Sequence, residues 1–253
     1  MAVGLQTADG EALSEPQHTE PATHSVLASL REMIVTGQIA ANAPLRAEGL
    51  AAQLGVSRTP IRNALAVLSA EGLVNYGVNR GYTARAVSID DVLASIEVRA
   101  ALEAMAARQF VERGCEPQVL DAMRRAVASA RMIVDRGDWS EQIEAEWYHL
   151  NWVFHRAIHH GCHNSVLRAA IRMTLIYPIF GDALRLCPSI AANVPPRLRQ
   201  IPTATPPHIA RSQADHERLL AAIESGDSGE AERLMSGHVL ATKQRLNDAV
   251  IRS

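Results

Sequence analysis

The sequence predicts a mainly α-helical protein: an N-terminal winged helix-turn-helix with a two-stranded wing, followed by a C-terminal all-α helical bundle. Three observations predict this fold. Apolar residues recur at helical spacing through most of the chain, two short strand-like segments occur only near its first third, and positive charge concentrates in residues 25–88. The 253 residues are 47% hydrophobic and 21% charged, which is ordinary globular composition.

The charge distribution separates one basic module from the rest of the chain. The net charge is −2. Residues 1–24 hold four acids and no base, residues 25–88 hold six arginines against three acids, and residues 89–253 hold 19 bases against 20 acids. Only the middle segment therefore has the charge expected of a module that binds a polyanion.

Residues 1–23 lack apolar periodicity and are predicted to be a disordered tail. Residues 24–88 are predicted to form the winged helix-turn-helix. Glycines stop the first two helices, Ser57 is expected to cap the third, and two glycines and an asparagine in the turn between the strands allow positive φ. The expected elements are a helix from His24 to Gly37, helices Ala47–Leu54 and Arg58–Glu71, strands Leu73–Tyr76 and Tyr82–Val87, and the turn 77–81.

Residues 89–253 are predicted to form the helical bundle. Ser88 and Asp91 form a capping box, and Asp227 and Glu230 form another. The expected helices run over about 89–113, 117–136, 140–160, from Asn164 or Ser165 to a kink at Pro178, 208–225 and 229–251. Six prolines between Pro188 and Pro207 predict an extended loop. The expected apolar side of the first bundle helix comprises Val92, Ile96, Val98, Leu102, Met105 and Ala106.

The helix 58–71 has the properties of a DNA recognition helix. It is the second helix of the pair, and such a helix enters the major groove with its N-terminal residues leading. Its apolar face consists of Ile61, Ala64, Leu65 and Leu68. Arg58, Thr59, Arg62 and Asn63 lie off that face, where arginine can bind guanine and threonine can reach phosphate or base. Arg80 at the tip of the wing is placed to enter a minor groove or bind phosphate.

The histidines of the bundle suggest a metal site. Five of the ten histidines lie between His149 and His163, and the i, i+4 spacing places Asn151 with His155, and His155 with His159, on one helix face. His216 and His238 lie in the last two helices. Imidazoles that face the interior from three helices can hold a divalent metal, although a hydrogen-bonded core role is the alternative for any one of them.

Residues 25–88 closely resemble the GntR superfamily of bacterial transcription regulators. The resemblance rests on LAAQLGVSRTPIRNAL at 50–65, EGLV at 71–74 and NRG at 79–81. It implies that Ser57, Arg58, Thr59 and Arg62 contact operator DNA and that Gly81 approaches it closely. Glu48 departs from the pattern, because some relatives have a DNA-contacting arginine there.

Residues 88–250 resemble the FCD effector domain, the helical bundle of the FadR branch of GntR regulators. The resemblance rests on EVRAALE at 97–103, NWVFH at 151–155, DHERLLAAIESGD at 215–227 and MSGHV at 235–239. It implies a divalent metal held by Asn151, His155, His216 and His238, with a small organic acid bound beside it. Asn151 replaces an aspartate, and the lost charge favours zinc or nickel over a harder cation.

The resemblance also assigns the remaining polar residues of the bundle. Arg99 matches a recurrent family arginine and is expected either to bind the carboxylate of the effector or to form an ion pair with Glu103. Five histidines match no ligand position and are interpreted as surface or loop residues: His149, His159, His160, His163 and His208.

The predicted function is that of a transcription regulator and not of an enzyme. The N-terminal module binds double-stranded DNA, and the bundle senses a small organic acid and forms a homodimer that reads an inverted repeat. One alternative is a metal-dependent hydrolase using the histidine cluster, with Glu144 or Glu146 as base, although HExxH is absent. The other alternative is a DNA-binding protein with a purely structural bundle.

The sequence also predicts where the protein acts. No apolar run approaches the ~18 residues that a membrane helix needs, and the N-terminus lacks the basic start of a secretory signal. The three cysteines lie far apart without a CxxC motif, which argues against disulfides. We therefore expect a cytoplasmic protein without a membrane partner.

Overall fold

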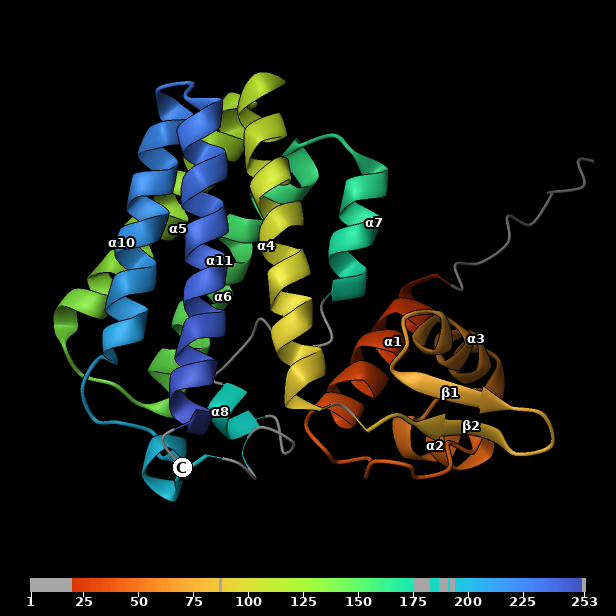
Figure 1. Ribbon diagram of the computed structural model, residues 1–253. Coiled ribbons are helices and arrows are strands. Elements are labelled where there is room, and N and C mark those ends of the chain that lie inside the picture. Colours follow the sequence, from red (N-terminus) through yellow and green to blue (C-terminus); the bar gives the residue numbers. More distant parts are fainter. Residues whose placement is uncertain (1–19, 87, 175–182, 187–190, 192–193, 252–253) are drawn as a thin grey trace, which may run out of the picture.

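The computed structural model describes residues 20–86, 88–174, 183–186, 191 and 194–251, which form a winged helix-turn-helix and a helical bundle (Figure 1). The first domain contains α1 (Glu20–Val35), α2 (Ala47–Leu54), α3 (Arg58–Ala70), β1 (Val74–Gly77) and β2 (Gly81–Ala84). Its core includes Leu30, Ile61, Leu65 and Leu68, all at most 1% exposed. The predicted fold class is confirmed.

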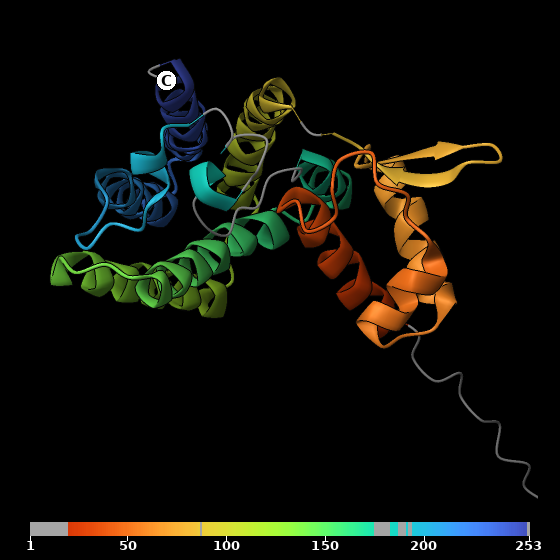
Figure 2. The same ribbon diagram turned by 90° about the horizontal axis from the view of Figure 1, so that it is seen from below.

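The wing is an antiparallel hairpin extended by a third segment of chain. Val74 pairs with Ala84, and Gly77 pairs with Gly81. The segment just before α2 also pairs with β2: the Leu45 amide donates to the Tyr82 carbonyl at 2.8 Å, and the Asn42 amide donates to the Ala84 carbonyl at 2.9 Å. The hairpin points away from the bundle in Figure 2. This pairing fixes the start of α2 beside the wing.

The predicted boundaries of the first domain need small corrections. Residues 20–23, expected to belong to the tail, form the first turn of α1, and residues 1–19 lie outside the described residues. Ser57 is the N-cap residue of α3, but its side chain accepts no capping hydrogen bond. In the wing turn, Asn79 and Gly81 have positive φ as expected and Gly77 does not. The second strand ends at Ala84, and Val87 lies outside the described residues.

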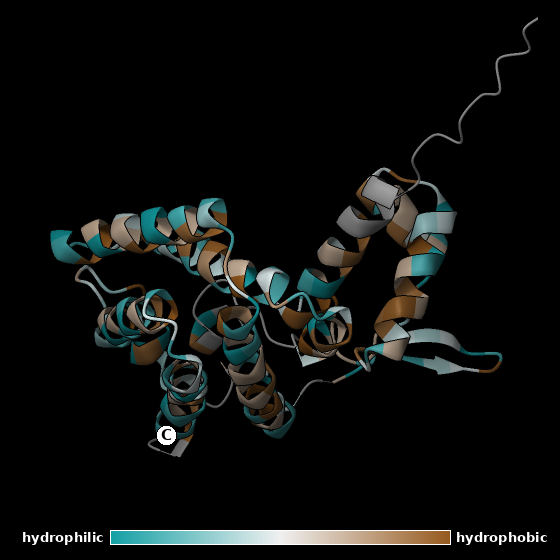
Figure 3. Ribbon diagram, turned by 90° about the horizontal axis from the view of Figure 1, so that it is seen from above, coloured by the Kyte–Doolittle hydropathy of each residue, from teal (hydrophilic) through white to brown (hydrophobic). Residues whose placement is uncertain are grey.

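The bundle is built from amphipathic helices, along which hydrophobic and hydrophilic segments alternate (Figure 3). Its described elements are α4 (Ile89–Glu112), α5 (Pro117–Arg136), α6 (Glu141–Gly161), α7 (Ser165–Thr174), α8 (Ala183–Leu186), a 3₁₀ helix (Pro196–Arg199), α10 (Pro207–Glu224) and α11 (Ser228–Ile251). α4 and α11 pack along most of their length. None of the described helices is both long enough and apolar enough to span a membrane.

The capping box of Ser88 and Asp91 is present, whereas that of Asp227 and Glu230 is only half formed, because the Asp227 amide donates to the Ala222 carbonyl. The Ser88 side chain accepts from the Asp91 amide, and the Asp91 carboxylate accepts from the Ser88 amide. The Asn164 side chain accepts from the Leu167 amide at the start of α7, and the Asp227 side chain accepts from the Glu230 amide at the start of α11. These bonds satisfy amides that have no partner within the helix.

Two further expectations about the helices and loops of the bundle are wrong. The buried face of α4 does not include Val98 and Met105, which are 53% and 38% exposed, because the helix instead buries Arg99 and Glu103. The proline-rich segment is not wholly extended, since Pro196–Arg199 forms a turn of 3₁₀ helix. The expected kink at Pro178 lies outside the described residues.

We expect Gly161→Ala to destabilise the bundle by about 1–3 kcal/mol, the usual cost of overpacking a core. A Cβ at Gly161 would lie 2.2 Å from Cε2 of Phe110, whose side chain is only 1% exposed. The helix propensity of alanine recovers at most about 1 kcal/mol, and less at the last residue of a helix. Urea unfolding of the metal-free protein measures the change.

Gly237→Ala in α11 is the matched control, because a Cβ there meets nothing within 4 Å. That substitution is expected to stabilise the helix by up to about 1 kcal/mol. Equal unfolding free energies for the two variants would contradict the close contact between Gly161 and Phe110.

Candidate functional site

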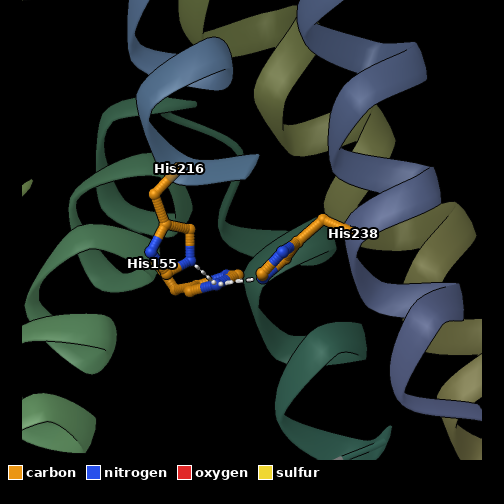
Figure 4. A group of neighbouring side chains, drawn as sticks. All are labelled: His155, His216 and His238. Carbon is orange, nitrogen blue, oxygen red and sulfur yellow. Dashed lines mark hydrogen bonds between the residues drawn. The ribbon is translucent and has the colours of Figure 1, made fainter. Parts of the chain in front are cut away.

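Three histidines from three helices meet in the interior of the bundle (Figure 4). His155 lies on α6, His216 on α10 and His238 on α11. The Nε2 atom of His155 is 3.2 Å from Nε2 of His238 and 3.3 Å from Nε2 of His216. The structure therefore brings together the three histidines that the sequence singled out as metal ligands.

Two carboxylates hold the outer nitrogens of the cluster. Nδ1 of His155 lies 2.7 Å from Oε2 of Glu103, and Nδ1 of His238 lies 3.4 Å from Oδ2 of Asp215. An ionised carboxylate only accepts hydrogen bonds, so the His155 proton is on Nδ1 and the lone pair is on Nε2. Carboxylates behind metal-binding histidines orient the rings in this way.

Burial keeps the imidazoles of His155 and His216 uncharged near neutral pH. It lowers the pKa of His155 to about 4, although Glu103 opposes this shift. Burial and the neighbouring rings of His238 and His155 hold the pKa of His216 well below its usual range. Burial alone would raise the pKa of Glu103, but its interactions with His155 and His159 hold that pKa well below its usual range.

The donor set fits a zinc- or nickel-like cation. A tetrahedral ion with metal–nitrogen bonds of about 2.0–2.1 Å separates its ligand atoms by about 3.3 Å. The two Nε2 separations at His155, 3.2 and 3.3 Å, match that requirement. Neutral imidazoles favour such borderline cations over calcium or magnesium, which prefer oxygen ligands.

A cavity of about 480 Å³ opens beside the cluster, a volume typical of small-molecule sites. Asn151 and Arg99, predicted as metal ligand and effector ligand, both line it and are each 7% exposed. Arg99 also forms the expected ion pair, with Nε 3.1 Å from Oε1 of Glu103. That Nε lacks a hydrogen-bond partner among the described residues. The pair therefore leaves Arg99 with unused hydrogen-bonding capacity.

His159 was wrongly assigned to the surface. Its side chain is 12% exposed, and Nε2 lies 3.1 Å from Oε2 of Glu103. Glu103, His155 and His159 thereby form a second group of converging ligand atoms beside the first. His149, His160 and His163 are exposed, as expected, whereas His208 is partly buried and lines the cavity.

Sequence reasoning overlooked the supporting carboxylates Glu103 and Asp215. The i, i+4 spacing of Arg99 and Glu103 predicted that they share one face of α4. It did not predict that this face lies toward the interior of the bundle. Asp215 precedes His216 directly, yet it bonds to His238 across the gap between α10 and α11. Only the packing of the helices shows this relation.

The start of α3 presents the predicted DNA contacts to solvent. Ser57, Arg58, Thr59 and Arg62 are all exposed, while the apolar face of the helix is buried. Because Ser57 makes no capping bond, its hydroxyl remains available. The positive φ of Gly81, 72°, makes the tight turn that ends the loop of the wing. The roles of these residues on DNA stay predictions.

We expect Arg62→Ala to weaken binding to a specific duplex by about 1–3 kcal/mol more than binding to a mixed-sequence duplex, as loss of a bidentate guanine contact would. Arg62 is exposed in the second turn of α3, so the change should leave the fold intact. Fluorescence anisotropy on both duplexes measures the difference. Equal losses would instead indicate a phosphate contact.

The chain matches two protein families over adjacent segments. Residues 22–83 match "Bacterial regulatory proteins, gntR family", and residues 94–241 match the FCD domain. The probable D-xylose utilization operon transcriptional repressor of Paenarthrobacter nicotinovorans is 27% identical over 222 residues, 86% of this chain and 87% of that protein. The transcriptional repressor GlaR of Escherichia coli (strain K12) is 29% identical over 138 residues, 54% of this chain and 62% of that protein.

Solved structures share the fold. McbR/YncC of E. coli superimposes with a TM-score of 0.62 at 21% identity, covering 89% of this chain and 97% of the other. Lar of Listeria monocytogenes superimposes with a TM-score of 0.55 at 16% identity, covering 93% and 99%. The families and relatives are transcriptional regulators, which excludes the hydrolase alternative. The chain belongs to the GntR family of DNA-binding transcriptional regulators, in the branch that carries an FCD domain.

Proposed function

We propose that this regulator binds a divalent metal and a small organic acid in its FCD domain and changes its operator affinity in response. The observation that carries the proposal is the convergence of three imidazole Nε2 atoms beside a cavity that His155, His238 and Arg99 line. His155, His216 and His238, with Asn151, would hold the metal. The metal would supply a Lewis acid for a carboxylate of the effector, and zinc or nickel suits the donors.

The cavity also offers a place for the far end of the acid. Arg211 lines the cavity from the first turns of α10, five residues before His216, and is exposed. In the part of the chain that the structure describes, Arg211 forms no ion pair. Five helical residues span about 7.5 Å along the axis. The site therefore best fits an acid whose second anionic or hydroxyl group lies about that distance from the carboxylate that binds the metal.

The alternative that the bundle is purely structural does not account well for the cavity. A structural core packs apolar side chains to high density, whereas this cavity is lined by Arg99, Asn151 and His155. Buried polar groups are costly unless they are hydrogen-bonded, and Arg99 Nε, although it lies 3.1 Å from Glu103, makes no hydrogen bond with the described residues. A ligand that accepts from Arg99 would remove that cost.

We also propose a cytoplasmic homodimer that reads an inverted repeat. One winged helix covers a short site, and specific operators generally need two. Val98 and Met105 lie seven residues apart on one side of α4 and are 53% and 38% exposed, as a self-association surface would be. Light scattering at micromolar concentration, with and without DNA, tests this. A monomer under both conditions would refute it.

The experiment for the effector site compares metal-stripped and metal-loaded protein. An operator duplex is first enriched from a random-sequence pool with the full chain. Its affinity is then titrated with a panel of mono- and dicarboxylic acids, using zinc or nickel as the loaded ion. We expect an acid-dependent change of about 5–150-fold in the loaded protein only. The same change in stripped protein would refute a role for the metal.

A further inference from the structure

A surface hollow on the winged helix-turn-helix gathers three arginines from three elements. Arg46 is the N-cap residue of α2, Arg62 lies in the second turn of α3, and Arg80 lies in the turn between β1 and β2. All three line the hollow and all three are exposed. The sequence predicts DNA contacts for Arg62 and Arg80 but none for Arg46.

The backbone pairing before α2 explains why Arg46 lies there. Pro44 forms a bridge with Thr83, and the Leu45 amide donates to the Tyr82 carbonyl at 2.8 Å. Leu45 itself is 5% exposed and anchors the segment in the core. Arg46 is therefore held beside the wing by strand-like bonds, and its side chain remains at the surface.

The hollow is positive, and the described residues provide no ion-pair partner for its arginines. Among the residues that the structure describes, Arg46, Arg62 and Arg80 form no ion pair. The other arginines before residue 88, apart from Arg58 on the recognition helix, are paired: Arg31 with Glu71 at 2.6 Å, and Arg85 with Asp91 at 2.5 Å. Three neighbouring cations without partners suit a polyanion.

We propose that Arg46 is a further DNA-binding residue, and that it forms with Arg80 a clamp on the phosphate backbone of the operator. α3 is the recognition helix and the wing reaches toward an adjacent minor groove. One sugar-phosphate strand separates a major groove from the neighbouring minor groove. That strand must cross between α3 and the wing, where the hollow lies. Arg46 thereby supplies a positive charge near Glu48, where the family resemblance implied an arginine that this chain lacks.

Arg46→Ala tests the clamp in the full-length protein. Binding is measured by fluorescence anisotropy at several salt concentrations, on the duplex enriched by the wild-type protein and on a mixed-sequence duplex. We expect a loss of about tenfold on both duplexes, as for a hydrogen bond to a charged group. The slope of log affinity against log salt should become less steep by about 0.9 for each bound chain.

Two further variants keep the test decisive. Arg125→Ala removes the same charge from an exposed position on α5 and is expected to leave the slope unchanged. Arg46→Lys keeps the charge and is expected to restore the wild-type dependence of log affinity on log salt. If Arg46→Ala acted only by disturbing the structure, keeping the charge would not restore that slope. An unchanged slope for Arg46→Ala, or a loss confined to the enriched duplex, would overturn the clamp.

Discussion

Glu103→Ala is expected to destabilise the metal-free bundle by about 3–5 kcal/mol, the usual effect of removing one partner from a buried ion pair. The Glu103 side chain is 1% exposed and interacts with Arg99, His155 and His159. Its removal leaves the charged Arg99 side chain, which is 9% exposed, without an ion-pair partner among the described residues. Chemical denaturation of stripped protein measures the loss without interference from metal binding.

Glu97→Ala on the same helix is the control. Glu97 pairs with Lys243 at 2.5 Å, but its side chain is 64% exposed, and surface pairs contribute about 0–1 kcal/mol. The double variant Arg99→Met/Glu103→Ala should recover part of the loss, because the unpaired buried charge is gone. Similar losses for Glu97→Ala and Glu103→Ala would contradict the buried role of Glu103.

The winged helix-turn-helix could be predicted closely because its signals are local. Glycines ended the helices, and the buried residues Ile61, Ala64, Leu65 and Leu68 were those of the predicted apolar face. The strand-like pairing of the segment before α2 was missed. That pairing depends on contacts with β2, nearly forty residues later, and the short segment carries no periodic pattern of its own.

The bundle was harder to predict where polar residues face inward. Apolar spacing placed Val98 and Met105 on the buried side of α4, yet that side carries Arg99 and Glu103 instead. Buried charged residues such as these depart from the rule that charged residues lie outside, and functional sites are where such departures are expected. The histidine cluster was nevertheless found, because the family resemblance identified its members. The positions of the carboxylates behind the cluster depend on how α4, α10 and α11 are rotated against their neighbours. The sequence of one helix does not contain that information.

If the proposed function is right, His216→Ala is expected to abolish metal binding in the bundle and with it the response of operator binding to an organic acid. His216 supplies one of three converging Nε2 atoms and is 2% exposed, between the rings of Trp147 and Phe154. Without the ion, nothing links α6, α10 and α11 to the acid at that point. Only a ligand with different affinities for two arrangements of the protein can change DNA binding.

In the metal-loaded wild type, the acid should change operator affinity by about 5–150-fold. In the variant, operator affinity should be the same with and without the acid. Affinity without acid should be kept, since the winged helix-turn-helix has its own core. Elemental analysis and operator titration are made on the same preparation, with His149→Ala as control because His149 is exposed on the same helix as His155. His238→Ala should behave like His216→Ala, because both supply Nε2 to the same cluster while only His216 packs between Trp147 and Phe154. A metal-free His216→Ala protein whose operator affinity still responds fully to the acid would show that the metal is not needed for the response.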